Sequence, residues 1–215
     1  MTVQPGNVEP FLPETILKNV FLGNGVELVS SNYSGFNISV GLFDNAEEVI
    51  GLERGIVLST GNAANVVKKN DQYPSSTATS GTSINDPDLE ALAGVQILDV
   101  ARYEMTFKPA SDLLNFRYVF ASEEYPNNVC AERNDAFGFF ISGPKPGGGR
   151  YEQENIARVP NPDRSGDFLD LPVTINSVNG GEAGIFSDGE MCTDEVNPFS
   201  IPSTTILSHK ALNHR

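Results

Sequence analysis

The stretch that decides the fold class is residues 101–120, ARYEMTFKPASDLLNFRYVF. Apolar and polar side chains alternate in both halves of it. The apolar faces of the two halves carry Ala101, Tyr103, Met105 and Phe107, and then Leu114, Phe116, Tyr118 and Phe120. Strict alternation is typical of an antiparallel strand with one buried face. The residues between the halves, PASD, have the length of a hairpin turn, so the stretch predicts two neighbouring antiparallel strands.

The rest of the chain repeats short strand-like runs between turn residues. Such runs lie at 26–29, 38–43, 55–59, 136–142 and 172–178, and two short helical patterns lie at 14–22 and 86–94. The 20 glycines and 14 prolines suit a protein with many turns. We therefore expect a mainly β fold, an antiparallel β-sandwich or jelly roll with one or two short helices. The apolar-poor stretch 70–86 predicts a long surface loop.

The composition excludes several classes of function. The chain has 28 acidic and 14 basic residues and a formal net charge of −14, which repels nucleic acid. It has no apolar run of the roughly 18 residues that a membrane helix needs, and its first residues show no signal peptide. Both histidines, His209 and His214, lie near the end, so the body of the fold lacks the histidine of Ser-His-Asp catalysis. We expect a protein that is not an enzyme.

Acidic and amide side chains gather between two of the expected strands, in residues 121–135. Glu123 and Glu124 follow the first strand, and Asn134 and Asp135 precede the second. Calcium binds six to eight oxygen atoms and accepts carboxylate, amide and backbone oxygens. The four residues are therefore candidate calcium ligands. The alternative is an acidic solvated loop in which Asn134 and Asp135 form a turn.

The chain has two cysteines, Cys130 and Cys192, which allow one intramolecular disulfide. Such a bridge would close a loop of about 60 residues and stabilise the fold by about 4 kcal/mol on the loop-entropy model. Neither cysteine belongs to a C-x-x-C pair and no histidine lies nearby in the sequence, so a zinc site is not expected.

Residues 116–144, FRYVFASEEYPNNVCAERNDAFGFFISGP, resemble the choice-of-anchor L domain family. Further matching blocks are ILKNVFLGNGVELVSSNYSG at 16–35, GIVLSTGNAANV at 55–66, ENIARVP at 154–160 and PVTINSVNGG at 172–181. The resemblance covers residues 14–197. It leaves a lead-in segment at 1–13 and an irregular tail at 198–215. The tail does not resemble the family's continuation, so we expect an incomplete domain, truncated at its C-terminal end.

The resemblance implies a module of a bacterial secreted or cell-surface protein, often large and adhesin-like. It brings no established catalytic residues. It favours calcium at Glu123, Glu124, Asn134 and Asp135, and the extracellular setting favours the Cys130–Cys192 bridge. The implied location is extracellular or at the cell surface, the implied partners are surface glycans or proteins, and further domains of a larger parent protein are expected.

Two other functions remain open from the sequence. One is a carbohydrate-binding module or part of a secreted glycan-degrading enzyme, because β-sandwiches with carboxylate loops commonly serve sugars. Sugar platforms usually present exposed aromatic rings, and the chain has no tryptophan, so Tyr73, Tyr125 and Tyr151 would have to serve. The other is a spacer domain whose acidic residues only keep its surface solvated.

Overall fold

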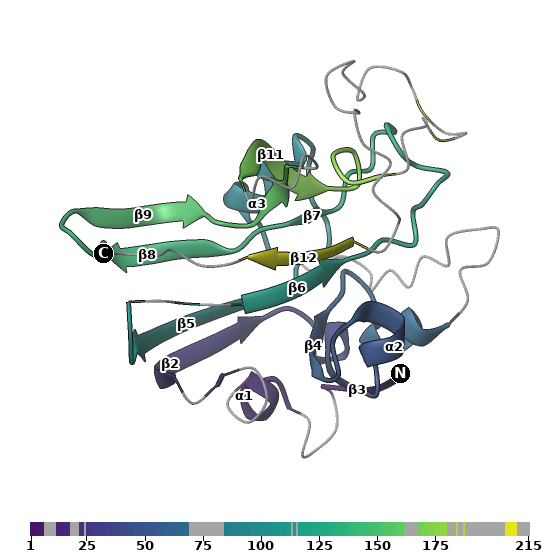
Figure 1. Cartoon of the computed structure of the whole chain (residues 1–215). Coiled ribbons are helices and arrows are strands. Elements are labelled where there is room, and N and C mark those ends of the chain that lie inside the picture. Colours follow the sequence, from purple (N-terminus) through teal and green to yellow (C-terminus); the bar gives the residue numbers. More distant parts are fainter. Residues whose placement is uncertain are drawn as a thin grey trace. The chain divides into compact units, whose positions relative to one another are not determined.

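A computed structural model describes residues 1–6, 12–17, 22–23, 25–68, 84–112, 114, 116–161, 167–179, 184 and 187, and the backbone of 205–209 (Figure 1). The chain forms two compact units. Unit 1 contains Met1–Asn85 and Leu98–Leu113, and unit 2 contains Asp86–Ile97 and Leu114–Arg215. Strands outnumber helices in the described residues, and every α-helix there is short. The mainly β class is therefore confirmed, while the sandwich or jelly-roll arrangement stays a prediction.

Among its described residues, unit 1 contains one three-stranded and one two-stranded antiparallel sheet. The first has the order β1 (Thr2–Pro5), β3 (Val40–Asp44), β4 (Gly55–Leu58), and the second pairs β2 (Val26–Ser34) with β5 (Arg102–Pro109). Its helices are α1 (Pro13–Ile16), α2 (Glu47–Ile50) and the 3-10 turns η2 (Asn37–Ser39) and η3 (Ala63–Val67). The first four residues of β3 are all buried, as expected for a central strand with a continuous apolar sequence. Gly41 is required there because a Cβ atom would lie 2.8 Å from the carbonyl oxygen of Gln4 on β1.

The alternation at 101–108 forms β5, and β5 pairs with β2 along its whole length. The rings of Tyr33 on β2 and Tyr103 on β5 lie 4.9 Å apart, and the Tyr103 hydroxyl donates to the carbonyl of Pro13, the first residue of α1. Burial raises the pKa of Tyr33 to about 12. The ribbon therefore buries one aromatic face, as the alternating sequence predicts.

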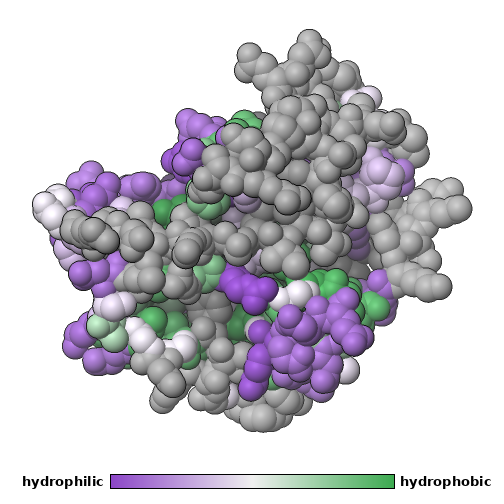
Figure 2. All heavy atoms as spheres, in the orientation of Figure 1, coloured by the Kyte–Doolittle hydropathy of each residue, from purple (hydrophilic) through white to green (hydrophobic). Residues whose placement is uncertain are grey.

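The described part of unit 2 contains one helix and three small antiparallel sheets. The helix is α3 (Pro87–Ala93), and the strands are β6 (Phe116–Phe120), β7 (Ala136–Phe137), β8 (Phe140–Pro144), β9 (Arg150–Asn155), β10 (Arg158–Pro160), β11 (Phe168–Thr174) and β12 (Thr205–His209). The sheets have the orders β10-β11-β7, β12-β6 and β8-β9. Four of the six residues of β9 are exposed and polar, and Figure 2 shows hydrophilic surface at this hairpin.

The core of unit 2 lies between β6 and the β10-β11-β7 sheet. Its buried centre is Ala157, Val159, Val173 and Val178. Tyr118 and Phe120 of β6 pack against it, and the Tyr118 ring lies 4.9 Å from that of Phe137. The Phe116 ring lies 4.4 Å from that of Phe139. These rings alternate in the sequence, so the predicted apolar face of 114–120 is the face that reaches the core.

The expected hairpin between 101–108 and 114–120 is wrong, because β5 pairs with β2 and β6 pairs with β12. The link at 109–112 leads from unit 1 to unit 2 instead, and Ala110 donates from its backbone to the carbonyl of Gly25. Hairpin length permits a turn but does not require one, because strand pairing also depends on long-range partners. In the described residues, strands also lie at 2–5 and at 205–209, within the expected lead-in and tail.

Other expected elements also have different bounds. The run 26–29 extends to Ser34 in β2, and the run 38–43 begins within η2 before β3 starts at Val40. The run 136–142 is interrupted at Gly138, whose Cβ would lie 2.5 Å from the Phe140 ring, and forms β7 and β8. The run 172–178 ends as a strand at Thr174 and continues as a turn, in which Ser177 caps the Thr174 backbone. The helix expected at 14–22 begins one residue earlier, and residues 18–21 lie outside the described residues, as does most of the expected loop at 70–86.

Candidate functional site

The acidic loop, residues 121–135, connects β6 to β7 within unit 2 through a series of turns. Ser122 joins its two ends. The Ser122 hydroxyl donates to Oδ2 of Asp135 at 3.2 Å and accepts from the backbone N–H of Glu124 at 3.2 Å. Ser122 therefore holds the start and the end of the loop together.

The middle of the acidic loop packs into the protein. Tyr125, Val129 and Cys130 are buried with Ile175 in a small apolar cluster, and the Tyr125 hydroxyl donates to the carbonyl of Val178. Asn128 donates from its side chain to the Glu124 carboxylate, and its backbone N–H donates to the Glu124 carbonyl at 2.9 Å. The loop is therefore an ordered turn structure with a core of its own.

Asn134 and Asn176 tie the acidic loop to its neighbours. The Asn134 amide is 8 % exposed and donates to the carbonyl of Ala93 at 2.6 Å, and its Oδ1 accepts from the backbone N–H of Asn176 at 3.1 Å. Asn176 Oδ1 in turn accepts from the backbone N–H of Cys130 at 2.8 Å. Both ends of the Asn134 side chain are thus used within the protein, which gives this residue a structural role.

The carboxylates of the acidic loop interact electrostatically. Partial burial raises the pKa of Glu123, and the charges of Glu124 and Asp135 raise it further. Burial and the Asp135 charge raise the pKa of Glu124, opposed by the Arg133 charge and the hydrogen bond from Asn128. Burial and Asp135 also raise the pKa of the Tyr125 hydroxyl. Three carboxylates therefore share one region of negative potential, which disfavours their full ionisation.

These residues carry the kind of oxygen atoms that calcium binds, but too few of them to fill its coordination shell. In the described part of the chain, no three acidic, cysteine or histidine side chains gather closely enough to hold a metal ion. The Asn134 oxygen already accepts a backbone hydrogen bond, whereas calcium takes six to eight oxygens. Glu123, Glu124 and Asp135 supply at most part of such a shell. The four-residue calcium site stays a prediction.

Cys130 is fully buried and its backbone has a positive φ of 64°. Its N–H donates to Asn176, as described above, and its carbonyl accepts from the Ser187 hydroxyl at 3.2 Å. Cys192 lies outside the described residues. The Cys130–Cys192 bridge therefore stays a prediction, with one partner held firmly in a buried turn.

The sequence reasoning missed the residues that organise the acidic loop, chiefly Ser122, Asn128 and Asn176. Asn176 could have been found, because it lies in the block PVTINSVNGG that resembles the family. Its distance of more than 40 residues from Cys130 and Asn134 gives no local signal of their contact. Ser122 and Asn128 lie inside the acidic loop but carry no charge, so their residue types alone do not mark them as metal ligands.

The stability of the acidic loop should depend on pH in the presence of a chelator. A carboxyl whose pKa is higher in the folded state binds its proton more tightly there, so it favours folding at low pH. That contribution is lost as the pH rises through the folded pKa values of Glu123 and Glu124. We expect the melting temperature to rise as the pH is lowered from 7 toward the ordinary glutamate value of 4.5.

Thermal melts of two variants measure this effect. The double variant Glu123→Gln, Glu124→Gln should flatten the dependence on pH. Glu47→Gln, Glu48→Gln removes the same number of carboxylates from the first turn of α2 and serves as the control for net charge. An equal slope in the acidic-loop variant and the wild type would show that these two carboxyls do not set the pH dependence.

The described part of the chain is a β-rich module with short antiparallel sheets and an ordered acidic loop. The described residues contain no helix that is long and apolar enough to cross a membrane. The family description that matches the chain is the Choice-of-anchor L domain, over residues 2–205. The chain therefore belongs to the choice-of-anchor L domain family, and it is a bacterial surface-associated module. No curated protein and no solved structure matched the chain significantly.

Proposed function

We propose that this chain is a non-enzymatic, adhesin-like module of a larger bacterial protein that works outside the cell or on its surface. The observation that carries the proposal is the family match, which spans nearly the whole chain. In the acidic loop and the neighbouring turn, Ser122, Asn128, Asn134 and Asn176 make hydrogen bonds within the protein, which supports a structural rather than a catalytic role for these four residues. The partners we propose are surface proteins or glycans.

A binding experiment separates this proposal from its alternatives. The immobilised chain is exposed to a broad glycan array, to extracellular-matrix proteins and to whole cells, with a heat-denatured sample as the control. Saturable binding to cells or proteins supports the adhesive role. Turnover of any glycan on the array would assign the chain to the degradative enzymes, and absence of all binding would assign it to the spacers.

A carbohydrate-binding function would require exposed tyrosine rings, and the two described candidates are buried. Tyr125 of the acidic loop is buried, and Tyr151 is buried with the Lys145 ammonium 4.6 Å above its ring. Tyr73 lies outside the described residues. A stacking platform for sugars needs exposed rings, so neither described candidate provides one in this conformation.

Calcium enters the proposal as a stabiliser of the acidic loop. The candidate ligands are the carboxylates of Glu123, Glu124 and Asp135. A divalent cation would relieve the repulsion between their charges. A ligand that binds only the folded chain stabilises it by about 2.7 kcal/mol at one hundred times its Kd. We therefore expect the melting temperature to rise with added calcium and to fall with chelator.

The matched pair Asp135→Asn and Asp170→Asn tests the location of that site. Both changes remove one aspartate charge from unit 2, but Asp170 is 95 % exposed on β11 and pairs with Arg158. The calcium response should disappear in Asp135→Asn and persist in Asp170→Asn. An identical melting temperature of the wild type with calcium and with chelator would overturn the calcium proposal and leave the surface-module proposal standing.

A further inference from the structure

An asparagine loses its side-chain amide most readily when glycine follows it, because glycine has no Cβ atom to hinder attack by its backbone nitrogen. The chain contains this pair twice, as Asn24–Gly25 and Asn179–Gly180. Asn24 and Gly180 lie outside the described residues, whereas Asn179 lies in the described turn that follows β11. The reactivity of Asn179 therefore depends on the contacts that its side chain makes in this turn.

The side chain of Asn179 is buried and held by two backbone carbonyls. It is 4 % exposed, and its Nδ2 donates to the carbonyl of Ile175 at 3.1 Å and to that of Asn176 at 3.0 Å. Nδ2 is the atom that leaves as ammonia when an asparagine is deamidated. In the folded turn this atom makes two hydrogen bonds and is screened from the water that completes the reaction.

Ser177 holds the turn closed. Its Oγ accepts from the backbone N–H of Thr174 at 2.9 Å and donates to the carbonyl of Pro172. The backbone N–H of Val178 also donates to the carbonyl of Thr174, at 2.9 Å, and Thr174 is 2 % exposed. A buried polar group that loses its partner destabilises the fold. Ser177 therefore stabilises the conformation in which Asn179 is held.

The same turn positions the acidic loop. Asn176 accepts from the backbone N–H of Cys130 through its Oδ1, and its own N–H donates to Asn134. An aspartate at position 179 would place a negative charge against the two carbonyl oxygens that now accept from the Asn179 amide. Both hydrogen bonds would be lost and the like charges would repel. Deamidation should therefore open the turn and weaken its hold on the acidic loop.

We propose that Asn179 is a deamidation site, that the folded turn protects it, and that its modification releases the turn from the acidic loop. The backbone nitrogen of Gly180 bonds to Cγ of Asn179 while the Cγ–Nδ2 bond breaks, and the Gly180 amide proton leaves with Nδ2 as ammonia. Water then opens the succinimide ring to aspartate or isoaspartate. The reaction consumes one water molecule and needs no oxidant or cofactor. It depends neither on calcium nor on the adhesin-like role.

Peptide mapping by mass spectrometry, on the full chain kept in mildly alkaline buffer, follows the conversion of Asn179. It should be at least about tenfold slower in the folded than in the denatured chain, because burial and two hydrogen bonds must first be given up. Ser177→Ala should raise the rate in the folded chain by about fivefold, the effect of losing one ordinary hydrogen bond.

Ser142→Ala is the matched control. Ser142 also accepts from a backbone N–H, that of Gln153 at 3.0 Å, but on the exposed β8–β9 hairpin of the same unit. This variant should leave the rate at Asn179 unchanged. Asn24, which also precedes glycine, is a reference within each sample.

Equal rates at Asn179 in the folded and the denatured wild type would overturn the protection, as would an unchanged rate in folded Ser177→Ala. Equal acceleration at Asn24 and Asn179 in that folded variant would replace local opening of the turn by general destabilisation. If Ser177→Ala does not fold, the folded and denatured wild type still decide whether the turn protects Asn179.

Asn179→Asp tests the consequence of the modification. Hydrogen exchange at residues 174–178 should be about tenfold faster than in the wild type, because two hydrogen bonds are lost. Asn37→Asp adds the same charge at an exposed position on η2 and should leave this exchange unchanged. Wild-type exchange in Asn179→Asp would overturn the proposed release of the turn.

Discussion

Asn134→Ala should lower the free energy of unfolding of unit 2 by about 3 kcal/mol. The change leaves two buried backbone groups without their partners, the carbonyl of Ala93 and the N–H of Asn176. An unsatisfied buried group costs about 1–3 kcal/mol, and two are created at once. Chemical denaturation followed by far-UV circular dichroism measures the loss.

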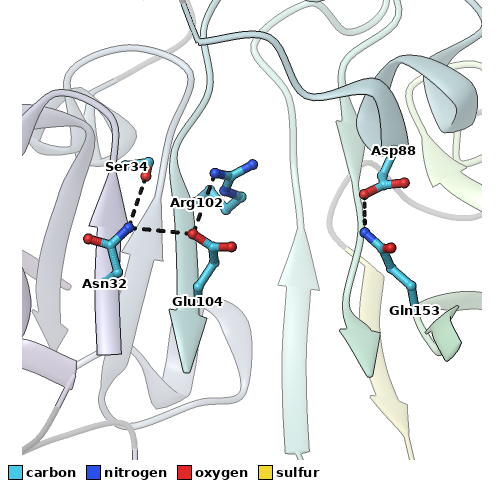
Figure 3. A network of polar contacts seen from close by, with 6 residues as sticks. All are labelled: Asn32, Ser34, Asp88, Arg102, Glu104 and Gln153. Carbon is cyan, nitrogen blue, oxygen red and sulfur yellow. Dashed lines mark hydrogen bonds and ion pairs between the residues drawn. The ribbon is translucent and has the colours of Figure 1, made fainter. Parts of the chain in front are cut away.

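The matched control for this change is Asn32→Ala. Asn32 also donates side-chain hydrogen bonds, to Ser34 and Glu104, but these are exposed on the β2–β5 ribbon (Figure 3). Water replaces exposed partners, so the control should change the unfolding free energy by less than about 0.5 kcal/mol. Equal, small effects of both substitutions would mean that Asn134 does not fasten the acidic loop. A calcium response that survives in Asn134→Ala would also remove this residue from the ligand set.

Cys130→Ser should destabilise the chain by about 4 kcal/mol if the proposed bridge to Cys192 exists, because a closed loop of about 60 residues restricts the unfolded state. The buried position of Cys130, with both backbone groups hydrogen-bonded, favours a structural bond that resists exchange. The measurement is the denaturation midpoint of the oxidised wild type, the reduced wild type and the variant.

Three further measurements test the Cys130–Cys192 disulfide directly. The unreduced chain should be lighter than the reduced chain by two hydrogen atoms, and a peptide linking Cys130 to Cys192 should appear after digestion without reductant. Reductant should lower the midpoint of the wild type and leave that of the double variant Cys130→Ser, Cys192→Ser unchanged. Two freely alkylated thiols in the oxidised, folded protein would contradict the bridge.

The acidic loop shows how far residue chemistry predicts a site. The sequence predicted that Glu123, Glu124, Asn134 and Asp135 would converge on a cation, and that site stays a prediction. In the structure the Asp135 charge raises the pKa of both Glu123 and Glu124. The sequence did not reveal that Asn134 would use its amide to join the acidic loop to α3 and to the turn at Asn176. An asparagine next to carboxylates has the same local pattern whether it binds a cation or a backbone. The difference depends on which backbone groups tertiary folding brings near.

Among the strands, those defined by local alternation were the easiest to predict. β5 and β6 have the expected inward faces, because the period of two follows from the geometry of a single strand. Their partners were not predictable in this way. β5 pairs with β2, which lies more than 60 residues earlier in the sequence. β6 pairs with β12, which lies more than 80 residues later. Pairing over such distances depends on the packing of whole units.

The sequence by itself determined that this protein is mainly β, strongly acidic and related to the choice-of-anchor L family, since alternation, composition and signature blocks are local properties. Only the tertiary structure decided where the chain divides into units, that α3 belongs with β7 and β11, and that Asn134 and Asn176 act as fasteners. The physical reason is the same in each case. Buried polar groups need hydrogen-bond partners, and apolar faces need other apolar surface to pack against. For these residues the partners and the packing surfaces lie far away along the chain.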